Sequence, residues 1–368
     1  MAALPEHLQA ILELARWAPS GDNTQPWRFE VLGDEHLLVH GFDTRDHVVY
    51  DLDGHASQLA LGALLETLRI AASTRGRRAQ VSRRPDTPDT HLLFDVRFEP
   101  AANPAPDPLA ECITQRVVQR RAMSMRALTA QQKAGLEQCL PAGYEVRWFE
   151  PLELRWRIAR FMFANAKIRL LIPEGHAVHS RAIEWGARFS EDRVPEQAVG
   201  VDPLTARLMR WAMASWGRLH FMNTWLLAHL PPRLLMDLIP GVRCAAHCAL
   251  LAPAPPVGVD DYLAAGSALQ RFWLSATRHG LLMQPEMTPV IFARYHREGR
   301  RFSVLGKAAA MAAAISRRLD GLLGASVAPR LFFMGRIGSR PVPRSRSMRK
   351  SLDALSVAAT FTTEPDDA

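Results

Sequence analysis

The chain has 368 residues, of which 48% are hydrophobic and 22% are charged. This length and composition allow a large buried core and exclude a chain that is disordered over most of its length. The formal net charge of +8 suits anionic partners such as phosphate cofactors, nucleic acid or an anionic membrane, without choosing among them. The four cysteines lack the spacing of a zinc site or of a secreted disulfide framework, and we expect no metal site.

The start of the sequence has no charged leader followed by an apolar segment, so we expect a soluble, cytoplasmic protein. No integral membrane span is expected, because no stretch of about 18 residues is free of charge. The nearest candidate is 211–235, which could form an amphipathic helix on a membrane, although a buried or lid helix is the favoured interpretation. The scattered basic residues show no aromatic-plus-basic module, so nucleic acid is not an expected partner.

Hydrophobic spacing and turn residues predict alternating helices and strands along the first third of the chain. The expected elements are a helix over 7–17, strands over 27–31 and 36–40, a helix over 56–72 and a strand over 92–98. A stretch rich in Pro and Ala over 100–108 then predicts an extended linker.

The rest of the chain continues this alternation around a long helical region over 152–238. The expected helices are 109–121, 130–140, 265–280 and 305–323, and the expected strands are 144–149, 244–251, 290–295 and 330–336.

A short internal similarity links the two parts. Gly54–Gln58 and Gly266–Gln270 both read G-x-A-x-Q, and each is expected to open an apolar helix that is followed by a strand. Chance can produce a three-residue match, but the shared order of elements favours a duplicated αβ unit. Two copies in one chain would form a pseudo-dimer that buries the faces a homodimer buries.

The segment Ala18–Phe29 reads A-P-S-G-D-N-T-Q-P-W-R-F. A helix end, a polar turn and a strand start explain its Pro, Gly and Asn, but not the order Gln25, Pro26, Trp27, Arg28. Together these residues offer an amide, a fixed backbone and a large apolar surface. A flavin ring needs this combination of an apolar platform and a few polar contacts.

The segment resembles the A-P-S-x-x-N-x-Q-P-W-x-F signature of the nitroreductase family of FMN enzymes. In that family the loop reaches across a dimer interface to a flavin that the other subunit largely binds. The resemblance implies that Ser20, Asn23 and Gln25 lie beside the FMN and that Pro19 shapes the loop, whereas Trp27 belongs to the core.

The family also carries two arginines, four residues apart on one helix face, that bind the FMN phosphate. The only matching pair in a suitable place is Arg116 and Arg120, because the chain begins without arginines. A phosphate dianion favours guanidinium donors side by side. Val118 replaces the usual serine between them, and a solvated helix face is the alternative interpretation of the pair.

Two further segments extend the resemblance. Residues 268–281 are similar to the family's A-x-Q-x-x-x-L-A-A-x-x-x-G-L helix, and the following loop with Gln284 and Pro285 is where family members present a backbone N–H near flavin N5. After the last strand, Arg346 and Arg349 would complete the phosphate site, with a plain basic tail as the alternative.

The resemblance therefore implies an α+β, nitroreductase-like fold of two tandem αβ halves forming a pseudo-dimer, as in the divergent mycobacterial Acg-type branch. We expect a first half over 1–105, a second half over 106–360 with a mainly helical insertion near 152–240, and a disordered tail over 361–368. The insertion could be a lid over the flavin. Whether the chain forms a further homodimer is left open.

The function implied is an FMN-dependent oxidoreductase that moves a hydride from NAD(P)H to a small, electron-poor acceptor such as a nitroaromatic or quinone. An FMN-sequestering protein without turnover and a specialised biosynthetic flavoenzyme are the alternatives. No catalytic residue is assigned, because the flavin carries the chemistry.

Overall fold

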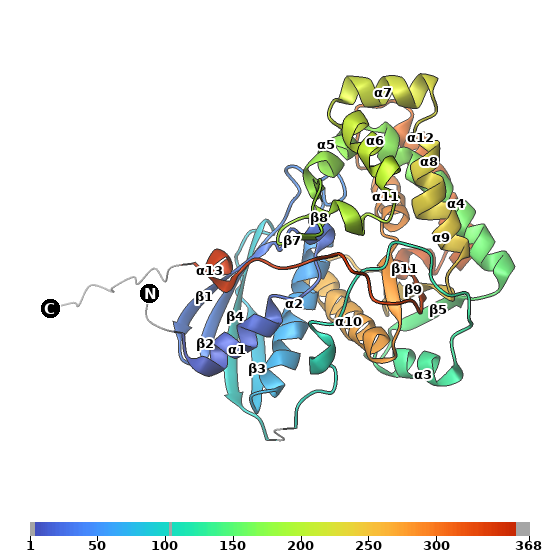
Figure 1. Cartoon of the computed structure of the whole chain (residues 1–368). Helices are drawn as coiled ribbons and strands as arrows, with labels where there is room; N and C mark the ends of the chain where they lie inside the picture. The colour runs from blue at the N-terminus through green and yellow to red at the C-terminus, as the bar shows by residue number, and fades with distance from the viewer. Residues whose placement is uncertain (1–3, 103–104, 358–368) are drawn as a thin grey trace.

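The computed structural model describes residues 4–102 and 105–357 and has an α+β fold. Two four-stranded antiparallel sheets lie on either side of a central pair of long helices, α2 (His55–Ser73) and α10 (Val259–Arg278), as Figure 1 shows. Among the described residues, every helix is too short or too polar to traverse a bilayer. The predicted tail over 361–368 lies outside the described residues.

The first sheet follows helix α1 (Glu6–Ala15) and has the strand order β1-β2-β4-β3. Its strands are β1 (Trp27–Gly33), β2 (His36–Phe42), β3 (Arg77–Arg83) and β4 (His91–Pro100). Alternate side chains such as the fully buried Trp27 and Phe29 face α1 and α2. The hydrophobic pattern did not predict β3, because this edge strand is mostly polar and exposes Arg78, Gln80 and Ser82.

The second sheet follows helix α3 (Ala130–Gln138) and has the strand order β10-β11-β9-β5. Its strands are β5 (Glu145–Phe149), β9 (Ala246–Leu251), β10 (Leu282–Pro285) and β11 (Leu331–Gly338). Every residue of β9 and β11 is buried, which explains why these strands appear in the sequence as short apolar runs.

The two sheets share one topology. A helix, two strands, a long helix and two strands follow one another in each part of the chain, as α1-β1-β2-α2-β3-β4 and as α3-β5-β9-α10-β10-β11. With the second sheet read from β5, the strand orders β1-β2-β4-β3 and β5-β9-β11-β10 correspond position by position. The second part differs by the segment between β5 and β9 and by two helices, α11 (Thr288–Arg297) and α12 (Ala308–Leu323), between β10 and β11.

The helices α2 and α10 pack closely because each has a glycine at their contact. A Cβ built on Gly62 would lie 2.0 Å from the carbonyl oxygen of Leu263, and one on Gly266 would lie 2.1 Å from that of Leu59. This corrects the predicted role of the Gly266–Gln270 motif. It lies inside α10, which begins earlier at Val259, and its counterpart in α2 is Gly62 rather than Gly54.

The segment between β5 and β9 is mainly helical, as predicted, and lies over one end of the second sheet in Figure 1. Its elements are α4 (Leu152–Leu171), α5 (Pro173–Ala182), β6 (Ile183–Glu184), β7 (Phe189–Ser190), β8 (Val194–Pro195), η3 (Glu196–Ala198), α6 (Pro203–Met213), α7 (Trp216–Trp225), α8 (Leu230–Arg233), a π-helical turn η4 (Leu234–Leu238) and α9 (Ile239–Val242). The short strand β12 (Arg346–Ser347) pairs with β7, so the C-terminal segment crosses back to this insertion.

Three predicted elements were wrong. The segment 109–121 is helical only at η2 (Ala110–Cys112) and then extends, with Val118 bridged to Met283 of β10. The predicted strand over 290–295 is part of α11, whose nearly all-round burial produces a continuous apolar run that periodicity cannot distinguish from a buried strand. The helix considered for 211–235 is divided, because α6 ends at Met213, α7 begins at Trp216 and ends at Trp225, and α8 begins at Leu230.

Candidate functional site

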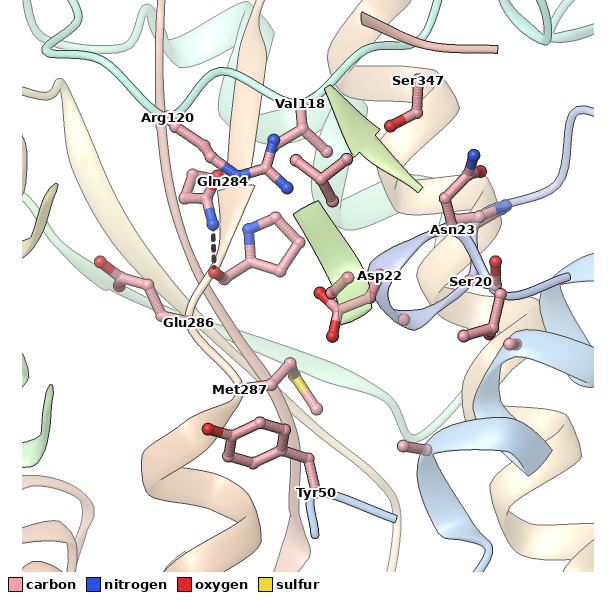
Figure 2. Close-up of a pocket in the computed structure, with 18 of the residues that line it drawn as sticks. Ser20, Asp22, Asn23, Tyr50, Val118, Arg120, Gln284, Glu286, Met287 and Ser347 are labelled. Carbon is pink, nitrogen blue, oxygen red and sulfur yellow. Dashed lines mark hydrogen bonds between the residues drawn. The ribbon is translucent and has the colours of Figure 1, made fainter. Parts of the chain in front are cut away.

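A cavity of about 420 Å³ lies where the loop between α1 and β1, the second sheet and the insertion meet. This volume falls in the usual range for cofactor sites, about 300–1,000 Å³. Figure 2 shows Ser20, Asp22 and Asn23 on one side of it, and Arg120, Gln284 and Glu286 on the other. Nine of the ten residues predicted as cofactor-binding line the cavity: Pro19, Ser20, Asn23, Arg116, Arg120, Gln284, Pro285, Arg346 and Arg349.

The loop that joins α1 to β1 has a strained backbone. Asp22, Asn23 and Gln25 have φ values of 46°, 66° and 50°, in the left-handed region that is costly for residues other than glycine. The Ser20 hydroxyl accepts a hydrogen bond from the Gln25 N–H at 3.0 Å, which closes the loop. The amide nitrogen of Asn23 donates to the backbone oxygens of Glu191 and Met348. The loop is therefore held against the insertion and the C-terminal segment.

Gln25 does not line the cavity. Its side chain is fully buried, and its amide nitrogen donates to Asn23 O at 3.0 Å and to Glu191 O at 2.8 Å. Its amide oxygen accepts from the Lys350 N–H at 3.0 Å. The predicted flavin contact is thus replaced by a contact that joins three distant segments of the chain.

Three arginines surround Trp17 and Trp273 at one end of the cavity. The guanidinium carbon of Arg116 lies 4.7 Å from the ring centroid of Trp273, and that of Arg346 lies 4.8 Å from the centroid of Trp17. Arg349 lies over the Trp17 ring at 5.8 Å. Arg116 and Arg349 are 4% and 8% exposed. We call these three residues the arginine cluster.

The arginine cluster has no carboxylate partner among the described residues. Arg116 and Arg349 donate to the backbone oxygen of Trp17, and Arg346 donates to that of Thr114. The Nε atoms of Arg116 and Arg346 are buried without a hydrogen-bond partner. Burial lowers the pKa of all three guanidinium groups, and mutual repulsion lowers that of Arg116 and Arg349 further. Such a cluster needs an anion to offset its charge.

Arg120 lies apart from the arginine cluster, which corrects the predicted pairing with Arg116. The two residues cannot share a helix face, because the segment that carries them is extended. Arg120 donates to Ala198 O and is close enough to Asp22, Arg336 and Arg169 to interact with their charges. Arg120 therefore lies in the part of the cavity that is opposite the arginine cluster.

Asp22 points into the middle of this opposite part, as Figure 2 shows. Asp22 is exposed to the open cavity, but desolvation by the surrounding protein raises the pKa of its carboxyl group, and the nearby charges of Arg120 and Arg169 offset part of this effect. Sequence reasoning missed Asp22, because it occupies an unspecified position of the motif.

Tyr50 and His179 form a second polar group near Asp22. The Tyr50 oxygen and His179 Nε2 are 3.1 Å apart. Burial lowers the pKa of His179 to about 3, with a further contribution from Arg169, so the ring is neutral, and its tautomer sets whether Tyr50 or His179 donates the hydrogen bond. Arg169 is itself paired with Asp237 at 2.9 Å. His179, Arg169 and Asp237 come from the insertion, where no motif marked them.

Glu286, His247 and Arg336 form a buried network of charged side chains. His247 belongs to β9, Arg336 belongs to β11, and Glu286 directly follows β10. Glu286 accepts from His247 Nδ1 at 2.7 Å and from Arg336 at 3.1 Å. His247 Nε2 lies 2.8 Å from Gly241 O, so both ring nitrogens face acceptors and the ring is protonated. Burial opposes this charge, but Glu286 and Cys244 outweigh it and raise the pKa of His247 to about 10.

The loop between β10 and α11 has fewer free backbone donors than the sequence suggests. Pro285 has no N–H, and the Glu286 N–H donates to Met334 O at 2.7 Å. Met287 and Thr288 follow at the N-terminus of α11, and both line the cavity. Within this loop, the backbone donors left to face the cavity are therefore those of Met287 and Thr288.

Residues 5–91 match the family model of the nitroreductase family. An uncharacterized protein of Mycobacterium tuberculosis, MT1398, is 24% identical over 78% of this chain and 39% of its own length. Two relatives from the same organism are named "Putative NAD(P)H nitroreductase acg" and "Putative NAD(P)H nitroreductase MT3217". Each is 34% identical, over 26% and 32% of this chain and over 28% and 35% of its own length. The matched regions thus span less than half of each relative. The family match confirms the resemblance predicted from the Ala18–Phe29 motif.

Proposed function

Since residues 5–91 match the nitroreductase family, we propose that the protein is an FMN-binding oxidoreductase of nitroreductase type. The observation that carries this proposal is the arginine cluster, whose buried, unpaired charges suit the phosphate dianion of FMN. The volume of the cavity and its strained polar loop suit the ring and the ribityl chain. Bound FMN would supply the redox chemistry, from a reduced nicotinamide to a small, electron-poor acceptor.

Different residues of the chain would bind different parts of FMN. Arg116, Arg346 and Arg349 would hold the phosphate group of FMN. Ser20 and Asn23 would keep the α1–β1 loop in place at the cavity, and the N–H groups of Met287 and Thr288 would supply donors that stabilise negative charge developing on the ring. The acceptor would lie beside Asp22 and the Tyr50–His179 pair, which offer a carboxyl group and a hydroxyl oxygen.

We also propose that the chain is a fused pseudo-dimer with halves over 1–105 and 106–360. The corresponding strand orders and the reciprocal contact of Gly62 and Gly266 support this. The composite character of the cavity supports it as well, because the loop comes from one half and the arginine cluster from the other. The cytoplasmic location stays a prediction.

Titration of the apo protein with FMN, followed by absorbance and flavin fluorescence, tests the proposal. Arg116→Ala and Arg349→Ala should each weaken FMN binding about 10- to 100-fold, because each removes a charge-assisted contact. The exposed Arg75 supplies the control, and Arg75→Ala should bind FMN like the wild type. A wild-type protein that binds no FMN would contradict the proposal.

Sequestration of FMN is the second candidate function, because Arg169, His179 and Met236 of the insertion line the cavity and restrict access to it. NADPH oxidation in the presence of a quinone separates the two candidates. Turnover supports the oxidoreductase, whereas tight FMN binding without any turnover favours sequestration.

A further inference from the structure

Helices α6 and α7 of the insertion expose an unusual number of large apolar side chains. Among the described residues, seven of the eighteen exposed large hydrophobic side chains fall within the 24 residues from 204 to 227. They are Leu204, Leu208, Trp211, Phe221, Trp225, Leu226 and Leu227. We call this surface, together with Arg207, Arg210 and Arg218, the apolar–basic patch. It lies at the outer end of the insertion, at the top of Figure 1.

The spacing of these residues gives each helix one apolar face that the fold does not use. Leu204, Leu208 and Trp211 lie at positions i, i+4 and i+7 of α6, whereas the buried residues of that helix are Ala206 and Ala212. Phe221 and Trp225 lie at i and i+4 of α7, with Trp225 74% exposed. A helix face of this width is normally covered. The sequence pattern favours a buried or lid helix over 211–235, and the exposure of Trp211 and Trp225 corrects that interpretation.

The charge of the patch is of one sign. Residues 203–236 contain four arginines and no aspartate or glutamate. Arg207 and Arg210 are exposed, and the guanidinium carbon of Arg218 lies 4.4 Å from the ring centroid of Trp211. Helices that lie in the interface of an anionic membrane have this composition. They combine tryptophan, leucine and phenylalanine with arginine and lack acidic residues.

We propose that the apolar–basic patch binds an anionic lipid surface, with α6 and α7 lying in the headgroup region and Trp211 and Trp225 inserted. A second copy of the chain is a poorer occupant. A two-fold interface formed by this patch would bring together two copies of its arginines, with no carboxylate in the segment to pair with them. The proposal concerns residues that do not line the cavity, so it does not depend on FMN binding.

Co-sedimentation with lipid vesicles tests the proposal. The full-length protein should bind vesicles of phosphatidylcholine and phosphatidylglycerol in equal parts about tenfold or more tightly than vesicles of phosphatidylcholine alone, because each arginine near the surface adds to the attraction. Phosphatidylcholine with brominated acyl chains, mixed into the anionic vesicles, should quench the tryptophan fluorescence of the wild type.

Two double variants separate the apolar and basic contributions. Trp211→Ser/Trp225→Ser should abolish binding and quenching, whereas Trp156→Ser, at a 48% exposed tryptophan of α4 outside the patch, should retain both. Arg207→Glu/Arg210→Glu should remove the preference for anionic vesicles. Arg75→Glu/Arg78→Glu, at two exposed arginines beside or within β3, should retain it and controls for net charge.

Three results would overturn the proposal. The first is equal binding to both kinds of vesicle, and the second is binding that the tryptophan double variant leaves unchanged in a protein with wild-type circular dichroism. The third is a wild-type dimer in sedimentation velocity that the tryptophan variant dissociates while neither protein binds vesicles, because the patch would then be covered by a second copy.

Discussion

Gly62 and Gly266 occupy reciprocal positions where α2 crosses α10. Gly62 faces the backbone carbonyl of Leu263, three residues before Gly266. Gly266 in turn faces the backbone carbonyl of Leu59, three residues before Gly62. A backbone carbonyl cannot rotate away as a side chain can, so this contact fixes the distance between the two central helices. The cavity lies beside this helix pair, because Leu59, Ala60, Ala63 and Leu269 line it.

Gly266→Ala should destabilise the protein by about 3 kcal/mol, at the upper end of the usual cost of overpacking, because its methyl group would meet backbone atoms. Urea denaturation followed by circular dichroism measures this change. Gly306→Ala is the control, since a Cβ there has open space and the residue has no left-handed φ, and its free energy of unfolding should stay within about 0.5 kcal/mol of the wild type. Equal stabilities for the two variants would disprove the tight crossing.

Asp22→Gly should stabilise the apo protein by about 1 kcal/mol. Glycine removes the strain of the left-handed backbone, and it also removes a carboxylate that the protein around the open cavity partly desolvates. Asp22→Asn removes the charge alone, and comparison of the two variants in urea denaturation separates the terms. If Asp22→Gly instead destabilises the protein, the attraction of the Asp22 carboxylate to Arg120 and Arg169 outweighs both the backbone strain and the cost of desolvating the carboxylate.

Gln25→Ala should destabilise the protein by about 1–3 kcal/mol, because it leaves the Lys350 N–H without its partner and leaves Glu191 O with only the hydrogen bond from Asn23. Hydrogen exchange should become faster at the Lys350 amide, which reports opening of the contact between the loop and the C-terminal segment. The exposed pair of Gln80 and Glu99 provides a control, and Gln80→Ala should change stability by less than about 0.5 kcal/mol. Unchanged exchange at Lys350 would refute the role given to Gln25.

His247→Gln should change how stability depends on pH. The pKa of His247 is raised in the folded protein, so its stabilising contribution is fully present below about pH 6.5, the unfolded value, and is lost as the pH rises toward about 10. The wild type should therefore lose more stability than the variant between pH 6.5 and 10, with a difference in slope of up to about 1.4 kcal/mol per pH unit. Parallel curves for the two proteins would show that His247 is neutral when folded.

The sequence by itself determined most of the elements of both sheets, the buried strand β9 and the motif that places Pro19, Ser20 and Asn23 at the cavity. It also selected Arg116, Arg346 and Arg349, which belong to two distant segments of the chain and come together in the arginine cluster. These features are local, because hydrophobic period, turn residues and a contiguous motif need no knowledge of distant neighbours.

Only the tertiary structure decided how these pieces meet. The segment of Arg116 and Arg120 is extended because Val118 bridges to β10, which separates two arginines that a helix would have paired. Gln25 turns from the cavity toward Lys350, and Asp22, Tyr50 and His179 converge from three segments that no shared motif links. Likewise, the exposure of Trp211 and Trp225 depends on which helix faces the fold covers. Long-range pairing and the packing of distant segments set these outcomes, and a local sequence pattern does not determine which distant segments meet.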